Sequence, residues 1–408
     1  LSGFCVSRYI SINPTLFCQS NADLTATAHP NKASRFVRCR VGQLRQRSVA
    51  VESLPIFPSE RRGLSCLARR STDPCKGKRS VFQDSVISEG IAAMFRILSL
   101  DGGGIKGTFT AAVLAELEAL LDRPLADYFD LVIGTSTGGI IGLGMGLGFE
   151  AQRILELYKE NADIIFPQSV RGKILSWIFS AKYDPEELRK ALAKVFGRRR
   201  LGDIDQHRVA VTSFNAVSGC PVVFKSPYHP SLRSHLDVEV VDIALATSAA
   251  PTYFPAAELE AGVMIDGGVW ANCPVMVGIT EAMSLFKQHR RDISVLSIGT
   301  TSTPFFVEEP VCSGGLLHWA NPVPLMMHAA KLGVLEQAKR LCRRLVRLDR
   351  EVSPDRFDLD GADGVEDLDD LGRDVARKHY QDVKRYFLRH PASKNEMMHS
   401  DLLMGAGI

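Results

Sequence analysis

Two glycine-rich turns in this 408-residue chain each follow a short apolar run and open a segment with helical periodicity. The runs are residues 95–100 and 131–134, and the turns are residues 101–107 and 135–138. A short, mainly apolar run bounded by glycine is typical of a buried strand. Successive strand–turn–helix units place their strands in parallel and cover them with helices. This pair of units therefore predicts an α/β fold.

The alternation of strand and helix patterns continues to residue 298. Predicted helices cover residues 107–121, 150–160, 185–196, 241–247 and 275–286 and a segment from about 137; further predicted strands cover residues 208–214, 222–225, 263–265 and 293–298. We expect residues 94–300 to form a three-layer domain, with a mostly parallel central sheet flanked by helices. Residues 301–392 are predicted to be a helical C-terminal extension packed on that domain, and residues 393–408 a loose tail.

The first 93 residues differ in composition from the rest. They carry 14 Lys and Arg against 6 Asp and Glu, and all ten methionines of the chain lie from Met94 onward. A basic, serine-rich leader is typical of an organellar transit peptide. Translation from a start site placed too early, with Met94 as the true first residue, would also produce it, and this interpretation is favoured. In either case we expect disorder.

Charge and cysteine content limit the classes of partner. The chain has a net charge of +3, and residues 94–408 alone are net negative, so no nucleic-acid partner is expected. The nine cysteines show no metal-ligand spacing, which indicates a reduced, cytoplasmic protein without a metal site. The longest uncharged run, residues 131–149, contains seven glycines, so it favours a strand, turn and helix over a membrane span.

The second turn contains GTSTG at residues 134–138, which is a GxSxG pattern. The flanking Gly134 and Gly138 allow a turn too tight for side chains, with Ser136 held at its tip. The following helix would supply positive potential at its N-terminus. The pattern alone is equally compatible with a structural turn, but its position between an apolar strand and a helix favours Ser136 as a nucleophile.

The first turn reads DGGGIKG at residues 101–107. It contains the GxGxxG pattern of a dinucleotide site, but the carboxylates with about the right spacing, Asp127 and Asp130, precede the second strand and do not end it. Crowded glycines also expose consecutive backbone N–H groups, which can cradle an oxyanion. An oxyanion hole is therefore favoured over a phosphate site or a plain tight turn.

A third glycine turn, Asp266–Gly267–Gly268, follows the apolar residues 263–265. An Asp-Gly pair is usually only a turn. A nucleophilic serine, however, needs a proton acceptor, and a carboxylate within hydrogen-bond reach can serve. Because a carboxylate with a pKa of about 4 is a weak base, we expect a dry environment around Asp266.

These three motifs, in this order, resemble those of the patatin-like phospholipases. The likeness extends to ATSAAPTYFP at residues 246–255 and covers roughly residues 95–299. The resemblance implies a patatin-like three-layer fold. It also implies a lipid acyl hydrolase that cleaves carboxylic esters of phospholipids or galactolipids without a metal or an organic cofactor.

The resemblance assigns a role to each position. Ser136 would be the nucleophile and Asp266 the base of a Ser–Asp dyad that lacks a histidine. The oxyanion hole would be lined by Gly102, Gly103 and Gly104. The supporting positions would be Lys106, Gly107, Gly134, Gly138, Gly267 and Gly268.

Two positions depart from the family pattern. Lys106 stands where arginine is usual, which keeps the charge but not the bidentate geometry. It could meet a phosphate headgroup, steady the loop or simply be a surface lysine. Cys273 stands where close relatives often have asparagine, which puts in doubt the hydrogen bonding near the dyad.

Two other functions stay open. An α/β-hydrolase would use a Ser–Asp–His triad, but none of the histidines after Asp266 sits in a recognisable loop at a strand end: His289, His318, His328, His379, His390 and His399. A catalytically silent lipid- or nucleotide-binding module would keep the scaffold, but all three motifs are intact.

Access to lipid is expected to be peripheral. The resemblance implies a membrane or micellar lipid substrate and a cytoplasmic protein that is membrane-associated when active. Some bacterial stand-alone members are effectors in cyclic-oligonucleotide antiphage systems, which implies a small-molecule activator, although no nucleotide pocket and no oligomeric state can be identified. One apolar cluster flanked by basic residues fits either an interfacial lid or a core helix: Ile174, Leu175, Trp177, Ile178 and Phe179.

Overall fold

The computed structural model describes residues 94–165, 183–303, 323–353, 356–357 and 364–392, which all belong to one unit of the chain that begins at Val81. The leader, the apolar cluster at residues 174–179 and the C-terminal tail lie outside the described residues. The expectations for those three segments therefore stay predictions.

A single sheet of eight strands lies at the centre of the described residues. The strands are β1 (Phe95–Leu100), β2 (Leu131–Thr135), β3 (Val209–Asn215), β4 (Cys220–Lys225), β5 (Ala257–Leu259), β6 (Gly262–Asp266), β7 (Ile293–Ile298) and β8 (Arg344–Leu348). Their order is β5–β6–β3–β2–β1–β7–β8, with β4 also paired to β3. The pairs from β3 through β2, β1 and β7 to β8 are parallel, whereas β4, β5 and β6 make antiparallel pairs.

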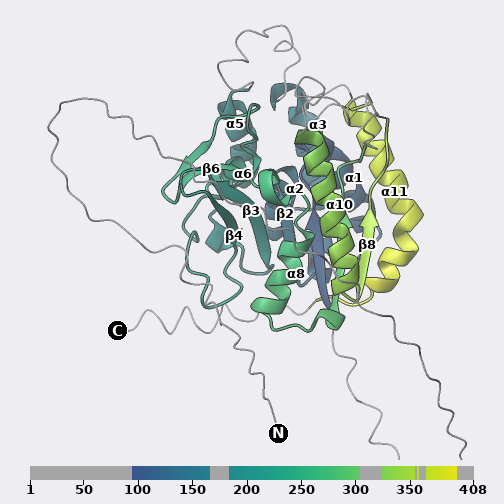
Figure 1. Ribbon diagram of the computed structural model, residues 1–408. Coiled ribbons are helices and arrows are strands. Elements are labelled where there is room, and N and C mark those ends of the chain that lie inside the picture. Colours follow the sequence, from purple (N-terminus) through teal and green to yellow (C-terminus); the bar gives the residue numbers. More distant parts are fainter. Residues whose placement is uncertain (1–93, 166–182, 304–322, 354–355, 358–363, 393–408) are drawn as a thin grey trace, which may run out of the picture. The chain divides into compact units, whose positions relative to one another are not determined.

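Helices cover both faces of this sheet. They are α1 (Gly107–Glu118), α2 (Thr137–Gly146), α3 (Ala151–Ile165), α5 (Pro185–Phe196), α6 (Val240–Ser248), α7 (Gly268–Ala271), α8 (Val275–Ser284), α10 (Val323–Leu341) and α11 (Val365–Tyr386), with 3-10 turns at Gly104–Lys106, Leu125–Tyr128, Leu201–Asp203 and Arg290–Asp292. α8 and α10 cover one face, and α1, α2, α3 and α11 pack together on the other (Figure 1). The three-layer arrangement expected from the sequence is confirmed.

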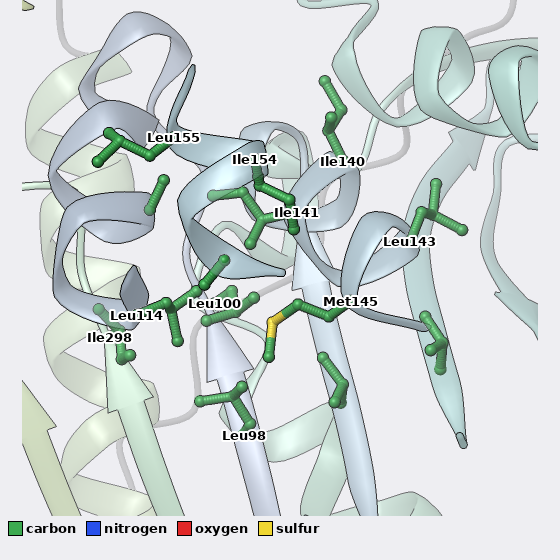
Figure 2. Packing of buried hydrophobic residues seen from close by; sticks show 14 of the residues in the cluster. Leu98, Leu100, Leu114, Ile140, Ile141, Leu143, Met145, Ile154, Leu155 and Ile298 are labelled. Atoms are coloured by element: carbon green, nitrogen blue, oxygen red, sulfur yellow. The ribbon is translucent and has the colours of Figure 1, made fainter. Parts of the chain in front are cut away.

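Burial on both faces explains why the central strands read as nearly continuous apolar runs. In β1, Leu98 belongs to the core cluster shared with α1 and α2, whereas its neighbour Ile97 belongs to the cluster shared with α8. The same alternation holds for Val132 and Ile133 in β2. Figure 2 shows the first cluster, in which side chains from α1, α2 and α3 pack against those of β1 and β7; its labelled members are Leu98, Leu100, Leu114, Ile140, Ile141, Leu143, Met145, Ile154, Leu155 and Ile298.

The strand register brings two distant segments together at one edge of the sheet. Thr135, the last residue of β2, pairs with Thr212 of β3. The next residue of β3, Ser213, pairs with Asp266, the last residue of β6. The residue after β2, Ser136, therefore lies beside Asp266 although 130 positions separate them in the sequence.

The predicted elements agree with the structure within a few residues through β7. Two strands were not predicted. β5 has only three residues, and β8 lies in the region that was expected to be helical. β8 pairs in parallel with β7 along Arg344–Leu348, so this part of the C-terminal extension belongs to the central sheet. The boundary between domains at residue 300 stays a prediction.

Among the helices of the described residues, none combines the length and the apolar character needed to cross a bilayer.

Candidate active site

Ser136 occupies the turn between β2 and α2. Its backbone has φ 53° and ψ −125°, in the left-handed half of the Ramachandran map. A non-glycine residue adopts such a conformation at a cost of about 1–3 kcal/mol, and only where its surroundings impose it. Here Ser136 N donates to Thr247 Oγ1 at 2.8 Å, and Ser136 O accepts from Ile140 N at 3.0 Å. The turn is therefore held from both sides with the serine at its tip.

The two glycines of the GxSxG pattern allow the chain to make this turn. A Cβ on Gly134 would collide with the carbonyl group of Gly138, and a Cβ on Gly138 would collide with the carbonyl oxygen of Leu100. Both glycines are thus required by close backbone approaches. The second contact also sets the distance between the serine turn and the end of β1.

The side chain of Asp266 accepts a hydrogen bond from Ser136. Ser136 Oγ donates to Asp266 Oδ2 at 2.7 Å, and Gly268 N donates to the other carboxylate oxygen at 2.6 Å. Both side chains are buried, with 8% of Ser136 and 6% of Asp266 exposed. The backbone of Asp266 is fixed by its N–H, which donates to Ala249 O at 3.0 Å. The turn has no room for a side chain at Gly267, because a Cβ there would collide with Thr212.

Burial raises the pKa of Asp266 from 3.8 to about 6, although the hydrogen bonds from Gly268 and Ser136 act in the opposite direction. Among the residues that the structure describes, no cation contributes to this shift. A carboxylate with a pKa of about 6 is a better proton acceptor than one in water, and it is still ionised at neutral pH. The dry environment expected around Asp266 is therefore present.

The glycine loop between β1 and α1 lies against the serine turn. The N–H of Gly102 donates to Asn272 O at 3.0 Å, and its carbonyl oxygen accepts from Thr300 Oγ1 at 3.0 Å. The N–H of Gly102 is therefore engaged within the protein. This differs from the expectation that all three glycines offer donors to an oxyanion, and it leaves Gly103 and Gly104 as the candidate donors.

The N–H groups of Gly103 and Gly104 meet no acceptor within the described part of the chain. They lie at the start of the 3-10 turn Gly104–Lys106, just before helix α1, where the backbone dipoles give positive potential. The loop is close to the serine, since a Cβ on Gly102 would lie 3.1 Å from Ser136 Cβ. Two free, adjacent donors beside a serine hydroxyl could hold the oxyanion of an acyl-transfer reaction.

Lys106 and Gly107 lie at the far end of the glycine loop. Lys106 N donates to Gly103 O at 3.2 Å, and Gly107 N donates to Gly104 O. A Cβ on Gly107 would collide with Thr137, the first residue of α2. Lys106 and Gly107 thus support the loop through their backbones.

Sequence reasoning did not single out three residues that hold the site together. Thr247 accepts from Ser136 N and donates to Thr212 O at 2.6 Å, so it ties the serine turn to β3. Asn272 O accepts from the N–H of Gly102, and Thr300 Oγ1 donates to the carbonyl oxygen of Gly102. Thr247 lies in the segment 246–255 that supported the resemblance, but nothing in the sequence marks Asn272 or Thr300 as a neighbour of the glycine loop.

No histidine of the described residues hydrogen-bonds to Ser136 or to Asp266. Of the six histidines that follow Asp266, His318 and His399 lie outside the described residues. His289 caps the 3-10 turn Arg290–Asp292, where its ring accepts from Arg291 N. The arrangement therefore offers a hydroxyl, a carboxylate and two backbone donors, which together fit acyl transfer.

The sequence matches one protein-family model and is similar to several bacterial and plant proteins. Residues 98–279 match the family model described as "Patatin-like phospholipase". The "cGAMP-activated phospholipase" of Pseudomonas aeruginosa is 41% identical over 209 residues, which are 50% of this chain and 62% of that protein. The protein of the same name in Vibrio cholerae is 29% identical over 348 residues, which cover 75% of this chain and 98% of the relative.

A plant relative and a solved structure complete the comparison. "Patatin-like protein 2" of Arabidopsis thaliana is 33% identical over 275 residues, which cover 56% of this chain and 67% of the relative. Among solved structures, VipD of Legionella pneumophila aligns with a TM-score of 0.36 and 11% identity over 70% of this chain and 67% of that one. On the strength of the family model and of its relatives, this chain belongs to the patatin-like phospholipase family.

Proposed function

We propose that this chain is a serine lipid acyl hydrolase that cleaves carboxylic esters of phospholipids or galactolipids. Ser136 is the nucleophile, Asp266 is the base, and the N–H groups of Gly103 and Gly104 hold the oxyanion. The substrate is presented by a membrane or micelle surface, which the protein contacts peripherally. The names of its bacterial relatives support a phospholipase activity.

The proposed reaction has two acyl-transfer steps. Asp266 takes the proton of Ser136 Oγ while that oxygen forms a bond to the ester carbonyl carbon, and the carbonyl oxygen gains negative charge. When the tetrahedral intermediate collapses, the bond to the alcohol oxygen breaks and Asp266 returns the proton to the leaving alcohol. Water then attacks the acyl-enzyme with Asp266 as base, which releases the fatty acid and restores the serine.

One observation carries the proposal: the 2.7 Å hydrogen bond from a strained, buried serine to a carboxylate that is itself buried without a cation. A serine at the end of a helix or in an ordinary turn needs neither the positive φ nor a desolvated partner. Both features raise the free energy of the folded protein, and both would help to activate a nucleophile.

The decisive experiment compares wild type with Ser136→Ala in hydrolysis of phospholipid vesicles and in labelling by a fluorophosphonate probe, which reacts with activated serines. We expect wild type to release fatty acid and to take up the probe, and Ser136→Ala to do neither. The matched control is Ser248→Ala, because Ser248 is also buried and its hydroxyl donates within its own helix, to Ala244 O and more weakly to Leu245 O. This control should behave like wild type.

The same experiment separates the competing functions. A folded wild type that neither hydrolyses lipid nor takes up the probe would support a silent binding module. A folded Ser136→Ala with full activity would overturn the assignment of the nucleophile. Profiling the products released from a mixed lipid extract would then identify the head group and the position of the cleaved ester.

Activation by a small molecule is part of the proposal. The relatives of P. aeruginosa and V. cholerae are named as cGAMP-activated. We propose that cGAMP also activates the present chain, and we expect it to raise the rate of fatty-acid release by wild type. Ser136→Ala should stay inactive with cGAMP present. Equal wild-type rates with and without cGAMP would remove this part of the proposal while leaving the hydrolase intact.

A further inference from the structure

The glycine loop begins with a buried carboxylate that the proposed chemistry does not use. Asp101 follows β1 directly and is 2% exposed. Its Oδ2 accepts from Arg347 Nη2 at 2.6 Å, across 246 positions of sequence. Arg347 lies in β8, in register with Ser297 of β7.

Arg347 is held in place by more than one partner. The same Nη2 also donates to Asp349 Oδ2 at 2.8 Å, and Nη1 donates to Ser297 Oγ at 2.7 Å. Burial by itself lowers the pKa of Arg347, but the carboxylates of Asp101 and Asp349 more than offset it, and the net direction is upward. Arg347 therefore stays charged. A buried guanidinium between two carboxylates has one favoured geometry, because its planar N–H groups point in fixed directions.

The ion cluster of Asp101, Arg347 and Asp349 is joined to the glycine loop through the backbone, because Asp101 is the first residue of the loop. Asp101 N donates to Ile298 O at 3.1 Å, and the next N–H, that of Gly102, donates to Asn272 O. The loop is thus fixed through its first two residues, immediately before the free N–H groups of Gly103 and Gly104. The cluster is closely packed, since a Cβ on Gly299 would collide with both Asp349 and Arg347.

We propose that Arg347 and Asp349 are positioning residues for the oxyanion-binding loop. Arg347 holds Asp101, Asp349 holds Arg347, and through Asp101 the cluster sets the direction in which the Gly103 and Gly104 N–H groups point. The inference rests on the proposed function, because it assigns those N–H groups to the oxyanion. The inference goes beyond the proposed function because it makes β8 a support of the active site.

This assignment enlarges the unit that is needed for activity. The family-model match ends at residue 279, and β8 begins at Arg344. β8 lies between α10 and α11 beside β7, so it is part of the sheet and not an appendage (Figure 1). A protein cut after the matched region would keep Ser136, Asp266 and the motif glycines, but it would lose β7, Thr300 and the arginine that Asp101 contacts.

The test compares Arg347→Met with a matched variant near the start of β1, the strand that Asp101 follows. Arg96→Met removes another largely buried arginine that faces a carboxylate, with Arg96 Nε 3.8 Å from Asp130 Oδ2. The two arginine side chains are similarly exposed, at 17% for Arg347 and 13% for Arg96. Each full-length variant is assayed for steady-state hydrolysis and for hydrogen exchange of the Asp101 and Gly102 amides.

We expect Arg347→Met to lower kcat by about 10²-fold, as a displaced catalytic group typically does, with little change in KM. Exchange at Asp101 and Gly102 should become faster. Arg347→Lys should recover part of kcat, because lysine keeps the charge but cannot contact both carboxylates as arginine does. Arg96→Met should lower the Tm while leaving kcat and the exchange of these two amides near wild type.

Wild-type kcat and wild-type exchange in a folded Arg347→Met would overturn the inference. Equal losses of kcat in Arg347→Met and Arg96→Met would also overturn it, because the effect would then be general destabilisation. If wild type shows no Ser136-dependent hydrolysis, the proposed function fails instead, and the exchange rates still decide whether Arg347 anchors the loop.

Discussion

Two buried aspartates, each at the carboxyl end of a strand, have opposite surroundings. Asp101 at the end of β1 accepts from the guanidinium of Arg347, which a second carboxylate also contacts. Asp266 at the end of β6 accepts from a hydroxyl and a backbone N–H, and no cation in the described part of the chain contributes to its pKa. Exposure is similarly low, at 2% and 6%. Burial alone therefore does not decide what a carboxylate does in this protein.

The difference lies in the compensating charge. A buried carboxylate that contacts a cation loses stability if that partner is removed, so it can act as an anchor. A buried carboxylate without a cation has a raised pKa and can exchange a proton near neutral pH. The same amino acid, at the same edge of one sheet, would thus serve as a fixed support in one loop and as a proposed base in the next.

The largest expected effect comes from removing each carboxylate in turn. Asp266→Asn should lower kcat/KM by at least about 10³-fold, because the base is lost. Asp101→Asn should lower it by only about 10- to 100-fold, because the loop is displaced but the base remains. Steady-state hydrolysis of a soluble ester measures both. Equal losses in the two variants would contradict the division into base and anchor.

The oxyanion donors give the next largest effect. In Gly103→Ala the new Cβ would collide with Thr300, so the loop must move and at least one donor is misplaced. Loss of one such donor costs about 10²- to 10³-fold in kcat. The matched control is Gly333→Ala on α10, where a Cβ meets nothing within 4 Å. It should keep wild-type kcat, and because alanine favours helix over glycine it should stabilise the protein by about 1 kcal/mol. A Gly103→Ala variant with the kcat of the control would contradict the role of the loop.

The raised pKa of Asp266 also predicts a stability effect with a defined sign. The folded protein binds the proton with a pKa of about 6 and the unfolded chain with a pKa near 3.8, so wild-type stability falls as pH rises through this range. The loss above pH 6 is at most about 3 kcal/mol, at 1.36 kcal/mol per pKa unit. Asp266→Asn escapes this loss, and its amide can still accept from Gly268 N and donate to Ser136 Oγ. Its Tm should therefore exceed that of wild type at pH 8, and the difference should shrink toward pH 4. A Tm difference that does not vary with pH would argue against the desolvated carboxylate.

The parts of the fold that the sequence predicted are those in which local pattern and tertiary burial agree. The strand at residues 95–100, the helix at residues 185–196 and the strand at residues 293–298 agree to the residue with β1, α5 and β7. In these segments the period of the apolar residues matches the element. The glycine turns were also predictable, since a close approach between backbones requires glycine, and clustered glycines are visible in the sequence without a structure.

The parts that were missed depend on contacts between distant residues. β8 reads Arg-Leu-Val-Arg-Leu, and its second arginine would normally indicate a solvent-exposed position. Only the fold shows that Arg347 meets Asp101. Likewise, the hydrogen bond from Gly102 N to Asn272 O could not be predicted, because the two residues are 170 positions apart and nothing around Asn272 marks it as a neighbour of the glycine loop. The fold was therefore more predictable than the residues that hold the glycine loop in place.

The smallest expected effect is the pH dependence of wild-type turnover, and it tests the base most directly. If ionised Asp266 accepts the serine proton, kcat/KM should fall tenfold per pH unit below about pH 6 and level off above it. A histidine base could give a limb at a similar pH, because its ordinary pKa is about 6.5. The two differ in heat of ionisation, since a carboxyl group loses its proton with almost no heat and an imidazolium absorbs heat. Repeating the profile at two temperatures should leave the limb in place for Asp266. A limb that moves to lower pH on warming would instead indicate a histidine, and would place the base outside the pair of aspartates compared above.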